Sequence, residues 1–429
     1  MKILVVGSGG REHAICWALQ AGARRHDIHL YCAPGNGGIA ELADCVALQP
    51  TDVAGLVRFA VERRIDLTIV GGEASLAAGL TDAFESSGLR VMGPSLSAAR
   101  LEVSKIFAKT FMAKHSIPTP RWRAASDAGE ALGILRSGEF GAETAPIVIK
   151  VDGLAAGKGV VVAKNRREAE AAVGELSAGN FSQQFVIEEA LEGCEVSLLL
   201  FADGRDYALM PPARDHKRVG DHDAGLNTGG MGAITSAEVI GEDHLEYVVR
   251  RIIEPSLGGA IADGFPFRGV LFVGLMLTED GPQVLEYNVR FGDPEAQAIL
   301  TRLKSDFVDV CEAVADRRLG GTNIVWANGA SACVVLAAPG YPVNPRTGGQ
   351  IQGLDRACRR AGVQIFHAGT TRSADGQWLT AGGRVLGVAS AAATLDEALG
   401  RCYLTAEDIH WDGIHYRRDI GKFSAGRST

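Results

Sequence analysis

The stretch Val284-Leu-Glu-Tyr-Asn-Val-Arg-Phe-Gly-Asp-Pro-Glu295 begins with a pattern typical of a β-strand. Side chains on a strand alternate between its two faces, so Glu286, Asn288 and Arg290 are expected to point the same way. A carboxylate and an amide supply the oxygen ligands that Mg²⁺ takes beside substrate phosphates, and a guanidinium suits a carboxylate or a phosphate. The other face is apolar, which favours a strand inside a core over the alternative, a merely solvated polar face.

The composition is that of an ordinary globular protein of two to four domains. The chain has 429 residues, a hydrophobic content of 46% and a net charge of −8 without a basic run, so a nucleic-acid partner is not expected. No apolar run is long enough to span a membrane. The eight cysteines are scattered without a Cys-x-x-Cys pair, so neither a zinc site nor a disulfide framework is indicated. We expect a cytoplasmic protein.

The first hundred residues show strand patterns that alternate with helix patterns, which indicates a parallel sheet. The apolar run Ile3–Val6 predicts a buried strand, and the glycine turn Gly7–Gly10 opens a helix over about Arg11–Ala21. A later strand, Ile65–Val70, is followed by Glu73. Ligands of such sheets bind beyond the carboxyl ends of the strands, so Glu73 is expected near the ligand of the glycine turn.

The glycine turn is a candidate anion site, because a turn that opens a helix exposes backbone N–H groups. A dinucleotide site is disfavoured for two reasons. Glu12 stands where the fingerprint G-x-G-x-x-G has its third glycine, and no acidic residue follows the second strand. A single phosphate on Gly9, Gly10 and Arg11 fits better, and a turn without a ligand is the remaining alternative.

A second unit has lysines around a glycine-rich turn. The strand pattern Pro146–Lys150 ends in a lysine, and the turn Gly153–Gly159 carries Lys158 and leads into another strand. The spacing lacks one residue and the terminal Ser/Thr of a P-loop, so we expect a strand–turn–strand flap. Together Lys105, Lys150 and Lys158 favour a nucleotide site, and the flap is expected to be mobile without nucleotide.

The next part of the chain predicts further strands around a polar stretch. The backbone of Val186–Ile187 is a weak candidate for pairing with an adenine edge, and Glu195 for reaching a ribose. The polar, glycine-rich stretch Arg214–Gly232 is expected to form a long functional loop. Residues 269–277 and 283–289 are expected to pair as a hairpin. From about Ala327 the pattern changes to that of a small α+β domain.

Together these stretches resemble one family across nearly the whole chain, the phosphoribosylamine–glycine ligases (glycinamide ribonucleotide synthetases) of the ATP-grasp superfamily. The matching stretches are Gly9-Gly-Arg-Glu-His13, Ala33-Pro-Gly-Asn36, Ile149-Lys-Val-Asp-Gly-Leu-Ala-Ala-Gly-Lys-Gly-Val160, Asp215-His-Lys-Arg-Val-Gly220, Asn227-Thr-Gly-Gly-Met-Gly232, Arg290-Phe-Gly-Asp-Pro-Glu295, Lys304-Ser-Asp306, His367-Ala-Gly-Thr370 and Gly382-Gly-Arg-Val385. Each matching stretch alone is modest evidence, but the whole set in this order is specific for the family.

The resemblance implies an α/β protein with an ATP-grasp fold. It places a Rossmann-like parallel-sheet domain for the phosphoribosyl substrate at residues 1–102. The ATP-grasp domain follows at 103–325, with a mobile lid at about 122–190, and a small α+β domain at 326–429. The implied activity is the ATP-dependent ligation of glycine to 5-phosphoribosylamine in de novo purine synthesis, with Mg²⁺ or Mn²⁺, by a monomer.

The resemblance also implies residue roles. The nucleotide would be bound by Lys105, Lys150, Gly157, Gly159, Ile187, Glu188 and Glu195. The metal would be bound by Glu286 and Asn288. Catalytic roles fall to Arg290, Asp215 and Lys158. The other substrates would be bound by Gly9, Gly10, Arg11, Glu73, Asp215, Asn227, Gly229 and Arg290.

Three departures from the family pattern lie on the acceptor side, while the ATP side matches it. Gly71-Gly-Glu-Ala-Ser-Leu76 stands where the family has Gly-Pro-Glu-Ala-Pro-Leu. Arg214 replaces a glutamine, and Leu226 replaces a proline. The main alternative is therefore a diverged paralogue that ligates a different amine or amino acid. An alternative of another class is a nucleotide-sensing module without catalysis.

Overall fold

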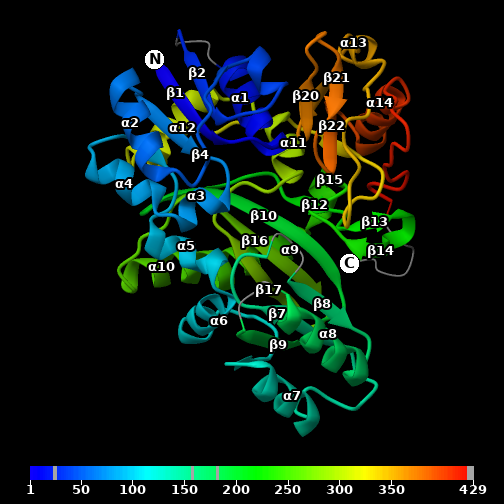
Figure 1. The fold of residues 1–429 in the computed structure, drawn as a ribbon. Helices are drawn as coiled ribbons and strands as arrows, with labels where there is room; N and C mark the ends of the chain where they lie inside the picture. The colour runs from blue at the N-terminus through cyan, green and yellow to red at the C-terminus, as the bar shows by residue number, and fades with distance from the viewer. Residues whose placement is uncertain (23–26, 156–158, 180–182, 423–429) are drawn as a thin grey trace.

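The computed structural model describes residues 1–22, 27–155, 159–179 and 183–422. The N-terminal unit, drawn in blue, and the C-terminal unit, drawn in orange, lie side by side (Figure 1). The lid, which contains β7 (Ile147–Val151), β8 (Val160–Ala163), β9 (Phe185–Glu189), α7 (Ala128–Ser137) and α8 (Arg166–Ala178), lies at the opposite end of the molecule. Within the described residues, no helix is long and apolar enough to cross a membrane.

The N-terminal unit is built on a five-stranded parallel sheet in the order β3-β2-β1-β4-β5. Its strands are β1 (Lys2–Gly7), β2 (His29–Pro34), β3 (Asp44–Cys45), β4 (Leu67–Val70) and β5 (Val91–Met92). Leu4 packs into one hydrophobic cluster and Val5 into another, so β1 is buried on both faces, which explains its continuous apolar run. The exposed edge strand β3 was not expected, because its two residues carry no apolar pattern.

Helices cover this sheet and connect it to the next unit. They are α1 (Gly10–Gly22), α2 (Val53–Arg63), α3 (Glu73–Ala77), α4 (Leu80–Ser86), α5 (Leu96–Val103) and α6 (Lys105–Lys114). Ser104 caps α6, because its hydroxyl accepts the N–H of Phe107. The cap fixes the point at which the chain leaves the N-terminal unit and places Lys105 at the start of α6.

A large antiparallel sheet runs through the rest of the molecule in the order β17-β16-β10-β12-β15-β18-β22-β19, with β11 beside β10. Its strands are β10 (Cys194–Asp203), β11 (Tyr207–Leu209), β12 (Ala213–Asp215), β15 (Gly232–Thr235), β16 (Arg268–Thr278), β17 (Gly281–Asn288), β18 (Ala330–Ala337), β19 (Val363–His367) and β22 (Arg384–Ala392). Because β15 pairs with β18, the C-terminal strands continue this sheet instead of forming a separate one.

The remaining helical and paired elements flank the large sheet. They are a helical run of α9 (Glu242–Val248), a π-helical turn (Val249–Ile253) and α10 (Glu254–Ala262), then α11 (Glu295–Leu300), α12 (Phe307–Ala315), α13 (Leu354–Ala357), α14 (Leu395–Ala406), and the small pair β20 (Thr370–Arg372) and β21 (Trp378–Thr380). Short 3₁₀ turns lie at Ile39–Glu41, Asp221–Asp223, Ala237–Val239 and Leu319–Gly321.

The expected hairpin of β16 and β17 is confirmed, with a β-bulge that the sequence did not reveal. Glu286 pairs with Gly274 and Val284 with Leu275, so Leu285 is the extra residue. Before the bulge Val284 faces the core, and after the bulge Tyr287 and Val289 face it, so the alternation of faces shifts by one residue. Bulges re-aim side chains beside functional sites. Here the bulge also turns the Leu285 carbonyl towards the lid, where Lys150 reaches it.

The lid is a four-stranded sheet in the order β6-β9-β7-β8, formed by β6 (Trp122–Ala125), β7 (Ile147–Val151), β8 (Val160–Ala163) and β9 (Phe185–Glu189). The helices α7 (Ala128–Ser137) and α8 (Arg166–Ala178) pack on it around a separate core. The expected strand–turn–strand flap is the β7–β8 hairpin. Two residues of its turn with predicted roles, Gly157 and Lys158, lie outside the described residues.

The polar stretch 214–232 is not the single long loop that was expected. It contains β12, a small hairpin of β13 (Arg218–Gly220) and β14 (Ala224–Asn227), and the start of β15. Arg417, which is 1% exposed, donates to the Asp223 carboxylate (2.7 Å) and to the Arg218 carbonyl (3.2 Å). The hairpin is therefore ordered by a residue almost 200 positions away, which local sequence does not reveal.

Candidate active site

Glu286 on β17 is a half-buried carboxylate surrounded by cations. Within the described residues, no group donates a hydrogen bond to it, and Gly274 leaves room beside it, since a Cβ there would lie 3.2 Å from its Cγ. Burial raises the pKa of this carboxyl, but the positive charges of Lys217, Lys150 and Lys105 outweigh burial and hold the pKa below its usual value. The carboxylate is therefore charged and has oxygens free for a ligand.

Three lysines from different parts of the chain surround that carboxylate. The Nζ of Lys150 on β7 lies 3.0 Å from Glu188 and donates to the Leu285 carbonyl at the bulge (3.1 Å). The Nζ of Lys105 donates to the Gly153 carbonyl (2.8 Å). The Nζ of Lys217 donates to Glu195 (2.9 Å), the predicted ribose contact. Lys217 was missed, because it stands in a stretch of mixed charges with nothing to distinguish it from a solvated residue.

Glu188 and Ile187 are more deeply buried than the sequence suggested. Glu188 is 1% exposed and lies 3.1 Å from the Nζ of Lys109, a buried lysine on α6 whose pKa burial lowers to about 8. The expected pairing of Val186–Ile187 with adenine is wrong. Strand β9 is paired on both sides, with Arg123 and Ile149 opposite Ile187, so its backbone groups are already used, and the Ile187 side chain packs in the lid core.

Arg290 is held by several partners in the chain. Its Nε lies 3.2 Å from Glu73, its Nη2 lies 2.8 Å from Glu102 and 3.1 Å from the Asn288 Oδ1, and its Nη1 donates to the Phe291 carbonyl. Each guanidinium nitrogen thus has an oxygen partner. A substrate carboxylate that took both arms of the fork would displace at least one of them. Glu102 on α5 gave no signal in the sequence, because a single glutamate in a helix is usually solvated.

The glycine turn is arranged differently from the expected phosphate cradle. The Gly9 N–H donates to the Glu12 carboxylate (2.5 Å), so it is not free for a phosphate. Glu12 is 2% exposed and lies so close to Gly71 that a Cβ there would be 2.3 Å from its Oε1. Arg11 donates to Glu12 (2.6 Å) and to the Phe291 carbonyl (3.1 Å). The turn and Arg290 therefore share one network.

The remaining predicted residues lie on or next to strands of the large sheet, of the β13–β14 hairpin and of the lid. Asp215 ends β12, and within the described chain nothing donates a hydrogen bond to its carboxylate. Burial raises its pKa to about 7, and Glu295 adds to this effect while Lys217 opposes it. Asn227 ends β14 opposite Arg218, and Gly229 follows in the next turn. Gly159 lies just before β8, where a Cβ would be 2.5 Å from the Val151 side chain.

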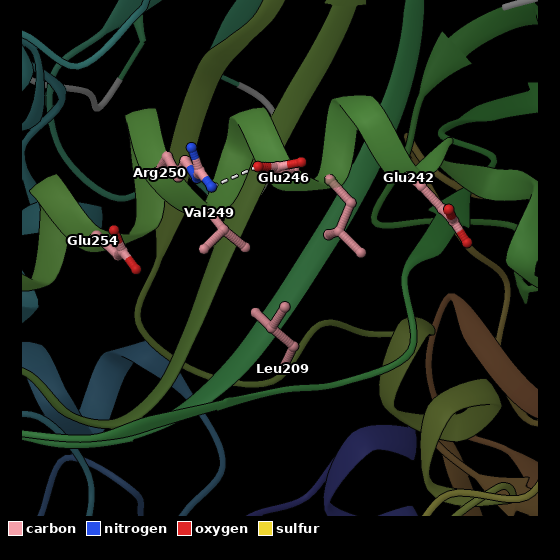
Figure 2. Close-up of a pocket in the computed structure, with 7 residues that line it drawn as sticks. Leu209, Glu242, Glu246, Val249, Arg250 and Glu254 are labelled. Atoms are coloured by element: carbon pink, nitrogen blue, oxygen red, sulfur yellow. Dashed lines mark ion pairs between the residues drawn. The ribbon is translucent and has the colours of Figure 1, made fainter.

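A hollow of about 650 Å³ lies away from these residues. It is lined by Leu209, Glu242, Leu245, Glu246, Val249, Arg250 and Glu254, and Figure 2 shows Arg250 turned towards Glu246, its ion-pair partner. None of the predicted site residues lines it. The candidate site is therefore defined by converging charges around β17 and not by this concave surface.

A solved structure shows the fold, and a family model identifies the class. The chain aligns with a biotin carboxylase from Campylobacter jejuni with a TM-score of 0.72 over 97% of this chain and 92% of that one, at 14% identity, which is a likeness of fold alone. Residues 103–296 match the family model described as the phosphoribosylglycinamide synthetase ATP-grasp (A) domain. The fold is that of an ATP-grasp ligase.

Closer relatives identify the family. Residues 1–102 and 331–423 match the N and C domains of phosphoribosylglycinamide synthetase. The chain is 46% identical to phosphoribosylamine–glycine ligase of Escherichia coli K12, covering 98% of both chains. It is similar to the solved structure of phosphoribosylamine–glycine ligase from Thermotoga maritima, with a TM-score of 0.83 and 33% identity over 98% of this chain and 100% of that one. The chain belongs to the phosphoribosylamine–glycine ligase family.

Proposed function

We propose that this protein ligates glycine to 5-phosphoribosylamine and consumes ATP, giving glycinamide ribonucleotide, ADP and phosphate in the second step of de novo purine synthesis. One observation carries the proposal. Strand β17 places Glu286 among lysines of the nucleotide side, while Arg290, just beyond the same strand, lies in the network that contains the glycine turn. Family membership supports the substrate assignment.

The reaction makes an amide from a carboxylate, which is a poor electrophile. A carboxylate oxygen of glycine attacks the γ-phosphorus of ATP, ADP leaves, and glycyl phosphate forms. The nitrogen of phosphoribosylamine then attacks the glycyl carbonyl carbon, inorganic phosphate leaves, and the nitrogen loses a proton. Such chemistry depends mainly on positioning and on stabilising the charge that develops during transfer.

On the nucleotide side, lysines would neutralise the phosphates. Lys105 and Lys150 already face Glu286 and can turn from their carbonyl partners to a triphosphate. Glu195 would contact the ribose, with Lys217 holding its carboxylate. Gly157, Lys158 and Gly159 of the flap would cover the phosphates and keep water from glycyl phosphate. Glu188 would act through Lys150, to which it is paired.

Glu286 and Asn288 would hold Mg²⁺, which neutralises phosphate charge when bound. The residues fit such an ion. The Glu286 carboxylate is ionised and free of hydrogen bonds within the described chain, and Arg290 donates to the Asn288 Oδ1, which fixes the orientation of the amide. No cluster of three or more His, Cys, Asp or Glu ligands is found among the described residues. Mg²⁺ at phosphate sites commonly uses one or two carboxylates together with the substrate.

On the acceptor side, Arg290 would bind the glycine carboxylate through its remaining Nη1 N–H and by giving up one of its partners in the chain, and Asp215 would take the glycine amine. Gly10, Arg11 and Glu73 would bind the phosphoribosyl group, with Gly9 shaping the turn. Asn227 and Gly229 would line the same pocket. We also propose a cytoplasmic monomer with the three domains 1–102, 103–325 and 326–429, and light scattering would test the monomer.

One observation favours the second candidate, a paralogue with another acceptor or amino acid. Gly72 stands where the family has proline, and a Cβ there would lie 3.1 Å from the Nη2 of Arg11. The glycine therefore gives Arg11 room that a substituted residue would restrict. Such a change beside the proposed phosphoribosyl contacts is where a new acceptor would be accommodated.

An ATP-consumption assay tests the proposal. Purified protein is given ATP, Mg²⁺ and each amino acid in turn, with phosphoribosylamine made in situ. We expect ADP formation that requires both glycine and phosphoribosylamine. ADP formation with a different amino acid or amine, and none with this pair, would identify the paralogue. Absence of substrate-dependent ADP with every pair would point to a nucleotide-sensing module.

A further inference from the structure

A C-terminal arginine reaches two turns of the ATP-grasp unit. Arg384 opens β22, and its Nη1 donates to the Gly229 carbonyl (2.5 Å) and to the Asp293 carbonyl (2.7 Å). Its Nη2 lies 3.1 Å from the Asp293 carboxylate. Burial lowers the pKa of this guanidinium, but the charge of Asp293 outweighs burial and raises it. One side chain thus joins the turn after β14 to the turn after β17.

Gly229 is held on both sides by C-terminal residues. Its N–H donates to the Tyr341 hydroxyl (3.0 Å), while its carbonyl accepts from Arg384. A Cβ on Gly229 would lie 3.0 Å from the Arg384 Cζ, so only glycine leaves room for the guanidinium. Gly383 makes similar room for Tyr341, because a Cβ there would lie 2.4 Å from its ring. Two glycines thus allow two side chains to hydrogen-bond to the backbone of one residue, Gly229.

Asp293 connects these contacts of Arg384 to the N-terminal glycine turn. Its second carboxylate oxygen accepts from the Gln297 amide (2.7 Å). A Cβ on Gly9 would lie 3.4 Å from the Asp293 Oδ2, and one on Gly10 would lie 2.7 Å from the Gln297 amide nitrogen. The Arg384–Asp293 pair therefore forms one wall of the space beside the turn proposed to take the phosphoribosyl group.

Arg384 is not needed to attach the C-terminal strands. Four residue pairs between β15 and β18 already continue the sheet across that boundary, from Gly232↔Val334 to Thr235↔Ser331. The side chain is aimed by a bulge, since Arg384 pairs with Ala337 and Leu386 with Leu336, leaving Val385 as the extra residue. A bulge that directs a half-buried cation into two turns indicates a positioning role more than a packing role.

We propose that Arg384, assisted by Tyr341, positions the turns at Gly229 and Asp293 for the acceptor, so that the C-terminal unit completes the phosphoribosylamine pocket. The inference rests on the proposed function. Loss of hydrogen bonds from a charged group should weaken acceptor binding about 10-fold or more. Neither of these two turns contributes a residue to the proposed ATP site, so the KM for ATP should change less than about 2-fold.

The test compares Arg384→Met, Arg384→Lys and Tyr341→Phe with the control Arg346→Met, an exposed C-terminal arginine. We expect a raised KM for phosphoribosylamine in Arg384→Met, a smaller rise in Arg384→Lys and Tyr341→Phe, an unchanged KM for ATP, and control values equal to wild type. The inference is overturned if all KM values change together with the melting temperature, or if none changes.

Glu286→Gln, measured beside these variants, separates the two proposals. If Glu286→Gln loses turnover while Arg384→Met keeps the wild-type KM for phosphoribosylamine, the inference alone fails. If Glu286→Gln keeps turnover, the proposed site fails and the inference fails with it. If Glu286→Gln loses turnover and only the acceptor KM rises in Arg384→Met, both proposals are supported.

Discussion

The proposed nucleotide side and the proposed acceptor side of the site contain different cations. Around Glu286 they are lysines, whose ammonium groups each have one or two oxygen partners in the chain. Around Glu73 and Asp293 they are arginines, which link several oxygens at once. A lysine is a mobile point charge, whereas an arginine is a rigid planar fork.

The difference indicates how each side receives its ligand. Lysines with few partners can swing onto phosphates that arrive and leave in each cycle. Arginines that already bridge helices and turns make a fixed frame, in which the acceptor meets groups that are preorganised. Substitutions on the nucleotide side should therefore mainly affect turnover, and substitutions on the acceptor side should affect stability as well.

The largest effect is expected for Glu286→Gln on the nucleotide side. The amide keeps the shape but removes the charge that faces the lysines and the proposed metal. Turnover should fall about 100-fold or more, the effect of losing one electrostatic stabiliser. Steady-state kcat at saturating Mg²⁺ measures it, with Glu279→Gln in the exposed hairpin turn as control. Near-normal kcat in Glu286→Gln would remove Glu286 from the proposed metal site.

A large effect on stability is expected for Arg290→Met on the acceptor side. It leaves Glu102, whose side chain is 7% exposed, without its cation, and uncompensated buried charge costs about 3 kcal/mol of unfolding free energy. Adding Glu102→Gln should recover part of the loss, because the charge is then gone. Urea denaturation measures both variants.

The matched control for Arg290→Met is Arg136→Met, which breaks a surface pair with Glu170 and should change stability far less. Equal losses in Arg290→Met and Arg136→Met would mean that the acceptor-side arginines are not a structural frame. A loss in the double variant as large as in Arg290→Met would show that the Glu102 charge is not its cause.

A smaller effect on stability should distinguish positions 72 and 75, where the family has proline and this chain does not. Gly72 has φ −113°, far from the proline value near −65°, and its Cβ position crowds Arg11. Gly72→Pro should cost about 1–3 kcal/mol and raise the KM for phosphoribosylamine. Ser75 lies in the first turn of α3, where proline is tolerated, so Ser75→Pro should stay within about 1 kcal/mol. Equal effects of the two prolines on stability and KM would show that the loop reshapes freely.

Local sequence was sufficient for much of the fold. Continuous apolar runs such as Ile3–Val6 predicted buried parallel strands, and period-two alternation correctly placed Glu286, Asn288 and Arg290 together. What failed were features set by distant partners. The Leu285 bulge depends on the register with β16, and the β13–β14 hairpin depends on Arg417.

The site was harder to predict than the fold, because burial changes what a charged residue can do. Nothing in the sequence distinguishes Glu12, which takes the Gly9 N–H, from a solvated helix residue. Lys109, Glu102 and Lys217 were missed for the same reason. The C-terminal stretch around Arg384 matched the family, but only the structure shows that its guanidinium reaches Gly229 and Asp293.

The smallest expected effect is the pH dependence of Glu73, which joins Arg290 to Arg11. Burial raises the pKa of Glu73, but the charges of Arg290 and Arg11 outweigh burial and lower the pKa to about 2. A carboxyl with a lowered folded-state pKa binds protons more readily in the unfolded chain. The contribution of Glu73 to the free energy of unfolding is therefore complete above about pH 4.5 and is lost as the pH falls towards about 2.

Glu73→Gln removes this contribution, so wild type and variant should differ in unfolding free energy near neutral pH and converge in acid. The side chain is 33% exposed, so solvent screening limits the difference to about 1 kcal/mol. Urea denaturation between pH 7 and pH 3 measures it, with the exposed Glu62→Gln on α2 as control. A difference that persists unchanged at pH 3 would mean that Glu73 acts through packing, and that the acceptor-side frame does not depend on its charge.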